Sequence, residues 1–135
     1  MKIIGFNFDK IYIEKMSNNL KELKINTKID IKNITSWKQE LFYTKEEVIE
    51  IKFGYEVDYS PDIAKISLSG NVVLLIDLKA AKKFTKEWKS KKLPEEYKLI
   101  IFNVIMKKSN LKSIQLEDEM NLPLHISLPS VKEAK

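Results

Sequence analysis

Strict alternation of apolar and polar residues marks the middle of the chain. From Val48 to Tyr59, apolar side chains occupy every second position, with charged residues or a glycine between them. A period of two is typical of a strand with one buried and one solvent-facing side. The same rhythm runs through Ile66–Leu78, and Ser60-Pro61-Asp62 supplies turn residues between the two segments. The sequence therefore predicts an antiparallel hairpin that the rest of the chain covers or extends.

Two further strands are predicted before this hairpin. Residues 3–14 alternate in two short registers that change at Asp9-Lys10, which indicates one strand with a bulge or kink. Ile25–Ile34 carries apolar residues on one face and charged residues between them, which favours a second strand. Between the two, Met16–Lys24 combines turn residues with two leucines at helical spacing. We expect a crossover there, with room for one helical turn.

Thr35–Lys45 shows no strand period and is predicted to be a loop, although it is rich in large apolar residues. They are Trp37, Leu41, Phe42 and Tyr43. Two interpretations are open. These side chains fold back onto the sheet as additional core, or they form an adaptable apolar surface for a partner.

The apolar period changes to that of helices after the hairpin. Leu78–Lys89 places Ala81, Phe84 and Trp88 along one side and lysines along the other, which predicts an amphipathic helix. Leu93-Pro94 ends this helix. Pro94 followed by two glutamates is a favourable start for the next one, because proline suits the first helical position and carboxylates suit the first turn.

The second helix is apolar around nearly its whole circumference as far as Met106. One sheet cannot cover such a helix, so we expect a second layer supplied by another subunit. The expected interface residues are Tyr97, Ile101, Phe102 and Ile105. A buried strand over the same residues is the alternative, since short apolar runs are ambiguous by periodicity.

The C-terminal segment Asn121–Pro129 alternates Leu122, Leu124, Ile126 and Leu128 and contains two prolines, which exclude a helix interior. We expect it to lie extended along an apolar surface. The acidic triplet Glu117-Asp118-Glu119 is expected to lead into the turn before it.

Composition changes this picture only slightly. The chain has 135 residues, of which 44% are hydrophobic and 32% charged, and this favours one globular α+β domain over residues 1–135. Cysteine is absent, which excludes disulfides, thiolate metal sites and a cysteine nucleophile. The sequence has no apolar run of signal-peptide or membrane-spanning length, so we expect a cytoplasmic protein with no membrane insertion.

The net charge of +5 is carried entirely by lysine, because the chain contains no arginine. Seven lysines gather between Lys79 and Lys92. Such a run is usually a solvated helix face, and the alternative is a nucleic-acid or polyanion-binding module. Nucleic acid is the less favoured partner, because lysine lacks the planar, bidentate fork of arginine.

Nothing in the sequence indicates catalysis. The single histidine, His125, would have to serve a hydrolytic triad with Ser127 or Ser130, and neither serine lies in a strained nucleophile elbow. One histidine with scattered carboxylates does not make a metal site, and the isolated glycines form no phosphate-binding loop. We therefore expect a protein that is not an enzyme and has neither a cofactor nor a metal.

Several short motifs follow one another in a recognisable order. They are an Ile-Tyr followed by charged residues in the first strand, three further strand segments, and a leucine-proline segment after the main helix. These segments are Asp9–Lys15, Lys28–Ile31, Glu46–Phe53, Ala64–Ile76, Asn121–Leu124 and Leu128-Pro129. In their order and spacing they resemble the SecB family of export and holdase chaperones over nearly the whole chain.

The resemblance implies a four-stranded antiparallel sheet with a long helix packed on one face. It also implies dimers that pair into a tetramer, and hydrophobic grooves that hold unfolded or partner polypeptides without ATP. Trp37, Leu41, Phe42 and Tyr43 would then line the client groove, with the tail residues Leu122, Leu124 and Ile126 nearby. Plain apolar surface suits this work, because promiscuous capture needs burial without directional contacts. The family is typically acidic, whereas this chain is basic.

Overall fold

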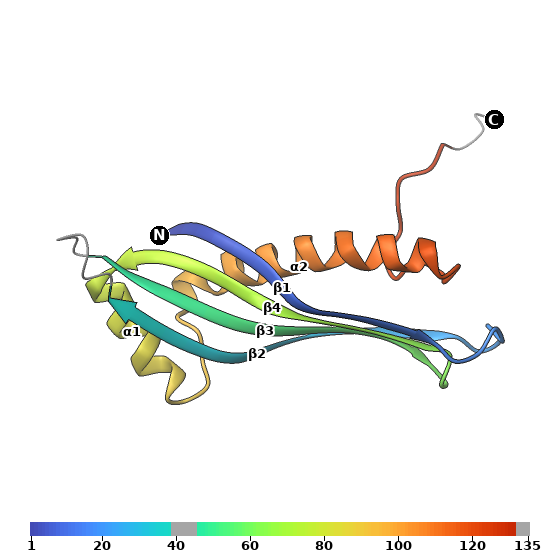
Figure 1. Cartoon of the computed structure of the whole chain (residues 1–135), viewed down its shortest axis with the longest axis horizontal. Coiled ribbons are helices and arrows are strands. Elements are labelled where there is room, and N and C mark those ends of the chain that lie inside the picture. Colours follow the sequence, from blue (N-terminus) through green and yellow to red (C-terminus); the bar gives the residue numbers. More distant parts are fainter. Residues whose placement is uncertain (39–45, 132–135) are drawn as a thin grey trace.

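The computed structural model describes residues 1–38 and 46–131, which form a long sheet and two helices (Figure 1). The elements are β1 (Lys2–Lys15), β2 (Lys24–Lys38), β3 (Glu46–Ser60), β4 (Ala64–Asp77), α1 (Leu78–Trp88) and α2 (Glu95–Glu119). The α+β class and the four-stranded antiparallel sheet predicted from the sequence are confirmed.

The sheet has the strand order β1-β4-β3-β2, and all neighbouring strands are antiparallel. Strands β3 and β4 form the predicted hairpin, turning at Pro61–Ile63. The connection from β1 to β2 passes this turn, where the backbone amides of Met16 and Ser17 donate to the carbonyl of Ile63 at 2.7 and 3.1 Å. It contains a turn at Lys21-Glu22 and not the helical turn we expected. The result is a Greek-key order with β1 and β2 at opposite edges.

Both edge strands contain an irregularity. The register of β1 against β4 shifts between Phe8 and Lys10, which confirms the bulge predicted at Asp9-Lys10. The register of β2 against β3 shifts between Ile31 and Asn33, so that Lys32 is an extra residue on its strand. Bulges of this kind bend an edge strand and interrupt its ladder of hydrogen bonds.

Both helices cover the same face of the sheet. The odd-numbered residues of β3 from Ile49 to Tyr59 and the even-numbered residues of β4 from Ile66 to Ile76 are buried on this face. Ala81 and Phe84 of α1 and Ile101 and Ile105 of α2 pack on one end of it. The other end is covered by Leu116 and Leu122, at the end of α2 and just beyond it.

Asp77 joins β4 directly to α1. Its carboxylate accepts a hydrogen bond from the amide of Ala80 at 2.8 Å, which is the usual way to satisfy a free N–H at a helix start. Pro94 lies at the start of α2, as expected, and Glu95 and Glu96 lie in its first turn. Proline suits a helix start, and carboxylates in the first turn favour the helix dipole.

Two predicted boundaries were wrong. Strand β2 continues through Thr35–Lys38, where a loop was predicted, because these residues pair with Glu47–Glu50 of β3 even though their side chains do not alternate. Helix α2 continues beyond Met106 to Glu119, so the acidic triplet forms the end of the helix and leads into the turn at Met120-Asn121, as expected. The buried stripe of α2 is maintained beyond Met106 by Ser109 and Ser113, whose small side chains show no apolar period in the sequence.

Candidate functional site

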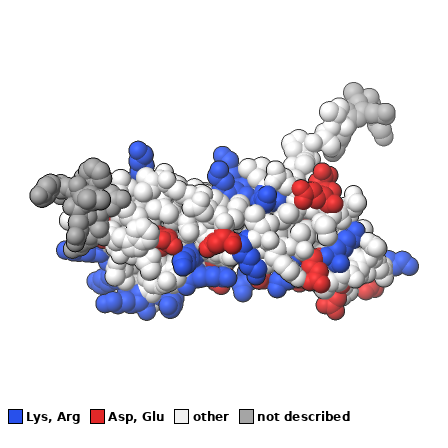
Figure 2. Space-filling view, viewed as in Figure 1, with Lys and Arg blue, Asp and Glu red and all other residues white. Residues whose placement is uncertain are grey.

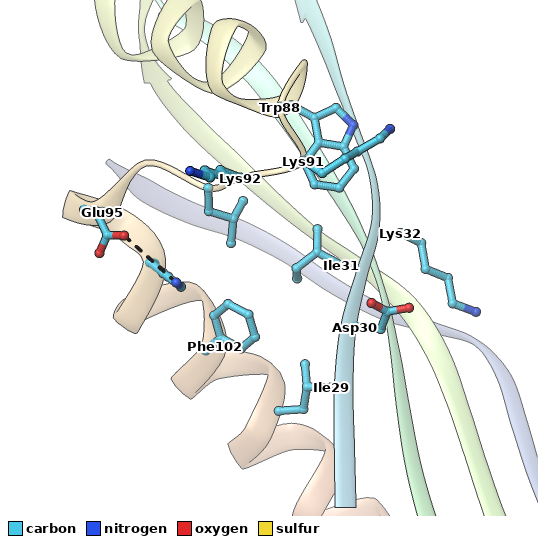
Figure 3. Close-up of a pocket in the computed structure, with 11 residues that line it drawn as sticks. Ile29, Asp30, Ile31, Lys32, Trp88, Lys91, Lys92, Glu95 and Phe102 are labelled. Atoms are coloured by element: carbon cyan, nitrogen blue, oxygen red, sulfur yellow. Dashed lines mark ion pairs between the residues drawn. The ribbon is translucent and has the colours of Figure 1, made fainter.

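A groove of about 880 Å³ lies where the edge strand β2 faces the junction between the two helices (Figure 3). Its walls come from the middle of β2, from the end of α1 and the turn after it, and from the first turns of α2. The lining residues are Ile29, Asp30, Ile31, Lys32, Trp88, Lys91, Lys92, Leu93, Glu95, Lys98 and Phe102.

The floor of the groove is apolar. Ile29 and Ile31 lie on the helix-covered face of β2, because their partners in β3 are the buried residues Tyr55 and Phe53. Both remain partly exposed, since no strand lies beyond β2 among the described residues and the helices leave this part of the edge open. Phe102 of α2 is likewise only partly buried, and Figure 3 shows it on the same side of β2 as the two isoleucines. The groove thus offers apolar side chains that the described chain does not fully cover.

The rim of the groove is basic. The ammonium of Lys91 lies over the ring of Trp88, 4.8 Å from its centroid, which is a cation–π distance. Lys98 lies 4.0 Å from the carboxylate of Glu95 (dashed in Figure 3). With Lys92, three lysines from the helix junction face one glutamate around this opening.

The residues predicted to bind a client lie elsewhere. Trp37 is 52% exposed, but its partner in β3 is Val48, which lies on the sheet face away from the helices, and Trp37 does not line the groove. Leu41, Phe42 and Tyr43 lie outside the described residues. Leu122 is buried in the core, Leu124 is half-buried and Ile126 is exposed. The groove was missed because a sequence does not show which strand forms an edge.

The predicted interface residues divide between core and groove. Ile101 and Ile105 have no exposed surface and pack against the chain's own sheet. Tyr97 is partly buried and stacks on Phe84, with ring centroids 5.4 Å apart. Phe102 lines the groove. The exposed apolar residues of α2 are a different set, Leu99, Ile100, Met106 and Leu111.

A second cluster, of buried polar groups, joins the end of α2 to the sheet and to the tail segment beyond Leu122. The carboxylate of Glu117 is fully buried and accepts hydrogen bonds from the hydroxyl of Tyr59 and from the backbone amide of His125, the latter at 3.0 Å. Nδ1 of His125 lies 2.9 Å from the same carboxylate. The side chain of His125 is thus almost fully buried beside this carboxylate.

The other side of the His125 ring completes this polar cluster. Its Nε2 lies 2.9 Å from both the Tyr55 hydroxyl and Oδ1 of Asn110, and the Tyr55 hydroxyl donates to Asn110 at 2.6 Å. Both ring nitrogens of His125 therefore have polar partners, Nδ1 in Glu117 and Nε2 in Tyr55 and Asn110. A buried carboxylate needs such partners, because an isolated charge inside a protein is costly. The cluster fixes the start of the tail against the sheet.

We expect the two tyrosines of this cluster to make the fold sensitive to alkali. Burial raises the pKa of Tyr55 to about 12. Burial, together with the hydrogen bond to Glu117, raises the pKa of Tyr59 further. The folded state holds protons that the unfolded state releases above about pH 10, so stability should be full below that pH and fall as the pH rises towards 12. Tyrosinate absorbance and circular dichroism recorded during one alkaline titration measure this. Ionisation of every tyrosine with the fold intact would contradict it.

The lysines of α1 lie on its solvent side. Ala80, Ala81 and Phe84 form its buried face, and Figure 2 shows basic side chains gathered over this helix. The ammonium of Lys83 pairs with the carboxylate of Glu96 at the start of α2. Most of this run is thus an ordinary solvated face, and no further feature of it favours the nucleic-acid alternative. Among the described residues, no helix is long and apolar enough to cross a membrane.

A four-stranded antiparallel sheet of order β1-β4-β3-β2 with both helices on one face is an α+β architecture, and it matches the SecB-like fold. A similar solved structure is that of the Mycobacterium tuberculosis SecB-like chaperone Rv1957 in complex with a ChAD peptide from the HigA1 antitoxin. The two chains share 10% sequence identity and superpose with a TM-score of 0.52, over 99% of this chain and 92% of that one. No protein-family model and no curated protein matches the chain.

Proposed function

We propose that this protein is an ATP-independent holdase that binds unfolded or partner polypeptides in the groove beside β2. The observation that carries the proposal is the apolar floor of Ile29, Ile31 and Phe102, which the described chain leaves partly uncovered. Burial of such surface is favourable and nearly independent of sequence, which is what a chaperone for varied clients requires. A further support is the similar fold of a chaperone that was solved with a peptide bound.

The double substitution Trp88→Ser with Phe102→Ser tests this proposal. We expect the variant to need about ten times more protein than the wild type to suppress aggregation of an unfolded client, because aromatic anchors dominate such interfaces. Light scattering without nucleotide measures the effect, and circular dichroism confirms that the sheet is retained. Trp37→Ser is the matched control, since it removes an exposed tryptophan outside the groove. If Trp37→Ser alone weakens suppression, the client site lies at that end of β2 instead.

We also propose that the outward side of α2 pairs with a second copy of the chain. Leu99 is 75% exposed and Leu111 is 57% exposed, and Ile100 and Met106 lie between them on the same helix. An exposed apolar surface of this length is typical of an interface. We expect Ile100→Lys with Leu111→Lys to reduce the solution mass from that of an oligomer to that of one chain, as measured by sedimentation equilibrium. A wild-type monomer would contradict the proposal.

A further inference from the structure

The main chain of β2 forms one wall of the groove. Ile29 to Ile31 and the extra residue Lys32 all line it, yet Figure 3 shows the side chains of Asp30 and Lys32 on the opposite side of the strand. What these two residues present to the groove is therefore their backbone. Strand β2 pairs with β3 on one side and has no strand on its other side among the described residues, so this edge offers unused amide and carbonyl groups. An open edge of this kind can pair with a further strand.

The charge of Lys32 is held away from the groove. A side-chain carbon at position 54 would lie 2.7 Å from Cε of Lys32, so the glycine there leaves room for the lysine chain on the far face of the sheet. The charges at the opening therefore come from the helix junction. Lys98 pairs with the carboxylate of Glu95. Neither Lys91 nor Lys92 has a carboxylate partner among the described side chains.

We propose, on the basis of the function proposed above, that the groove takes an extended polypeptide segment whose apolar centre is flanked by aspartate or glutamate. The segment adds as a strand to the free edge of β2 at Ile29–Lys32 and places its apolar side chains on the two isoleucines and Phe102. Backbone pairing supplies affinity without sequence readout, which is the principle of strand addition. The acidic flanks pair with Lys91 and Lys92, since complementary charge selects among otherwise similar ligands.

Two synthetic peptides with the same alternating valine and phenylalanine centre test the choice of client, one flanked by aspartates and one by lysines. We expect fluorescence anisotropy with the full chain to give at least about tenfold tighter binding of the acidic peptide. Lys91→Glu with Lys92→Glu should reverse this preference. Lys107→Glu with Lys108→Glu is the control, because it changes the net charge equally at exposed positions outside the groove.

Two further peptides test strand addition. Both carry the acidic flanks, and each has N-methyl groups on one of the two sets of alternate amides in its centre, which removes hydrogen-bond donors and keeps the side chains. We expect the peptide methylated on the set that faces β2 to bind about tenfold more weakly than the unmodified peptide. Equal binding of acidic and basic peptides, or no effect of methylation on either set of alternate amides, would overturn this inference while the holdase assay still stands. Failure of every peptide to bind, with aggregation suppression unaffected by the Trp88 and Phe102 substitutions, would overturn the proposed function as well.

Discussion

Replacing Glu117 with alanine is expected to lower the free energy of unfolding by about 3–5 kcal/mol. The carboxylate is fully buried, and it is the acceptor for the hydroxyl of Tyr59, for the amide of His125 and for Nδ1 of the His125 ring. Alanine removes the acceptor that these three donors share in the interior, and each buried unsatisfied donor costs about 1–3 kcal/mol. Urea denaturation followed by circular dichroism measures the loss.

Two further variants show whether the effect comes from this polar cluster. Glu119→Ala removes a carboxylate from the same end of α2, but at an exposed position, and should change stability by less than about 0.5 kcal/mol. Glu117→Gln retains one oxygen acceptor and should fall between the two. We also expect Glu117→Ala to expose the segment after Leu122 to proteases, because His125 is then no longer fixed to the helix. A loss no larger than that of Glu119→Ala would show that the cluster does not secure the tail.

The predictions from sequence succeeded where side-chain alternation and backbone pairing coincide. Strands β3 and β4 were predicted to within two residues at all four ends, because one face of each strand is buried and the other is more exposed. The sequence could not show that β2 reaches Lys38. There the strand is maintained by its ladder to β3, and the exposed residues Thr35 and Ser36 carry no apolar signal.

The polar cluster could not be predicted because its members meet only through the topology. Glu117 belongs to an acidic triplet, and His125 lies in a tail between two prolines. Nothing in the sequence around either residue indicates that its side chain is buried. They are brought together because the buried stripe of α2 continues beyond Met106 and the chain then turns back at Asn121. The sequence contained one indication that the helix continues. Ser109 and Ser113 are small residues at helical spacing, and both lie on the buried side of α2.

The groove was hidden for a related reason. Ile29 and Ile31 were correctly placed on one face of a strand, and Trp88 on the apolar side of α1, but their common opening depends on β2 being an edge. In the sequence, large apolar residues in an apparent loop, such as Trp37, indicated a client site more strongly than Ile29, Ile31 and Trp88 did. The structure places Trp37 in a strand, on the face that the helices do not cover.

The close approach of β1 to β4 makes Gly70 the position most sensitive to an added methyl group. An ideal Cβ at this residue would lie 1.9 Å from the carbonyl oxygen of Asn7, which is far shorter than any real contact. The main chain of β1 crosses here just before its bulge, and this path brings Phe6 and Phe8 to the ring of Phe53, with centroids 5.3 and 6.3 Å away. The clash is with backbone, so no side chain can rotate to relieve it.

We therefore expect Gly70→Ala to displace β1 and to lower the free energy of unfolding by about 3 kcal/mol or more, since overpacking against a fixed backbone lies at the high end of such effects. Gly5→Ala is the matched control in the same pair of strands. Its Cβ would lie 3.5 Å from Cβ of Val73, an ordinary contact, so a change below about 1 kcal/mol is expected. Urea denaturation of both variants makes the comparison. Equal stability would mean that β1 does not pass over Gly70, and the packing of Phe6 and Phe8 on Phe53 would then have to be abandoned with it.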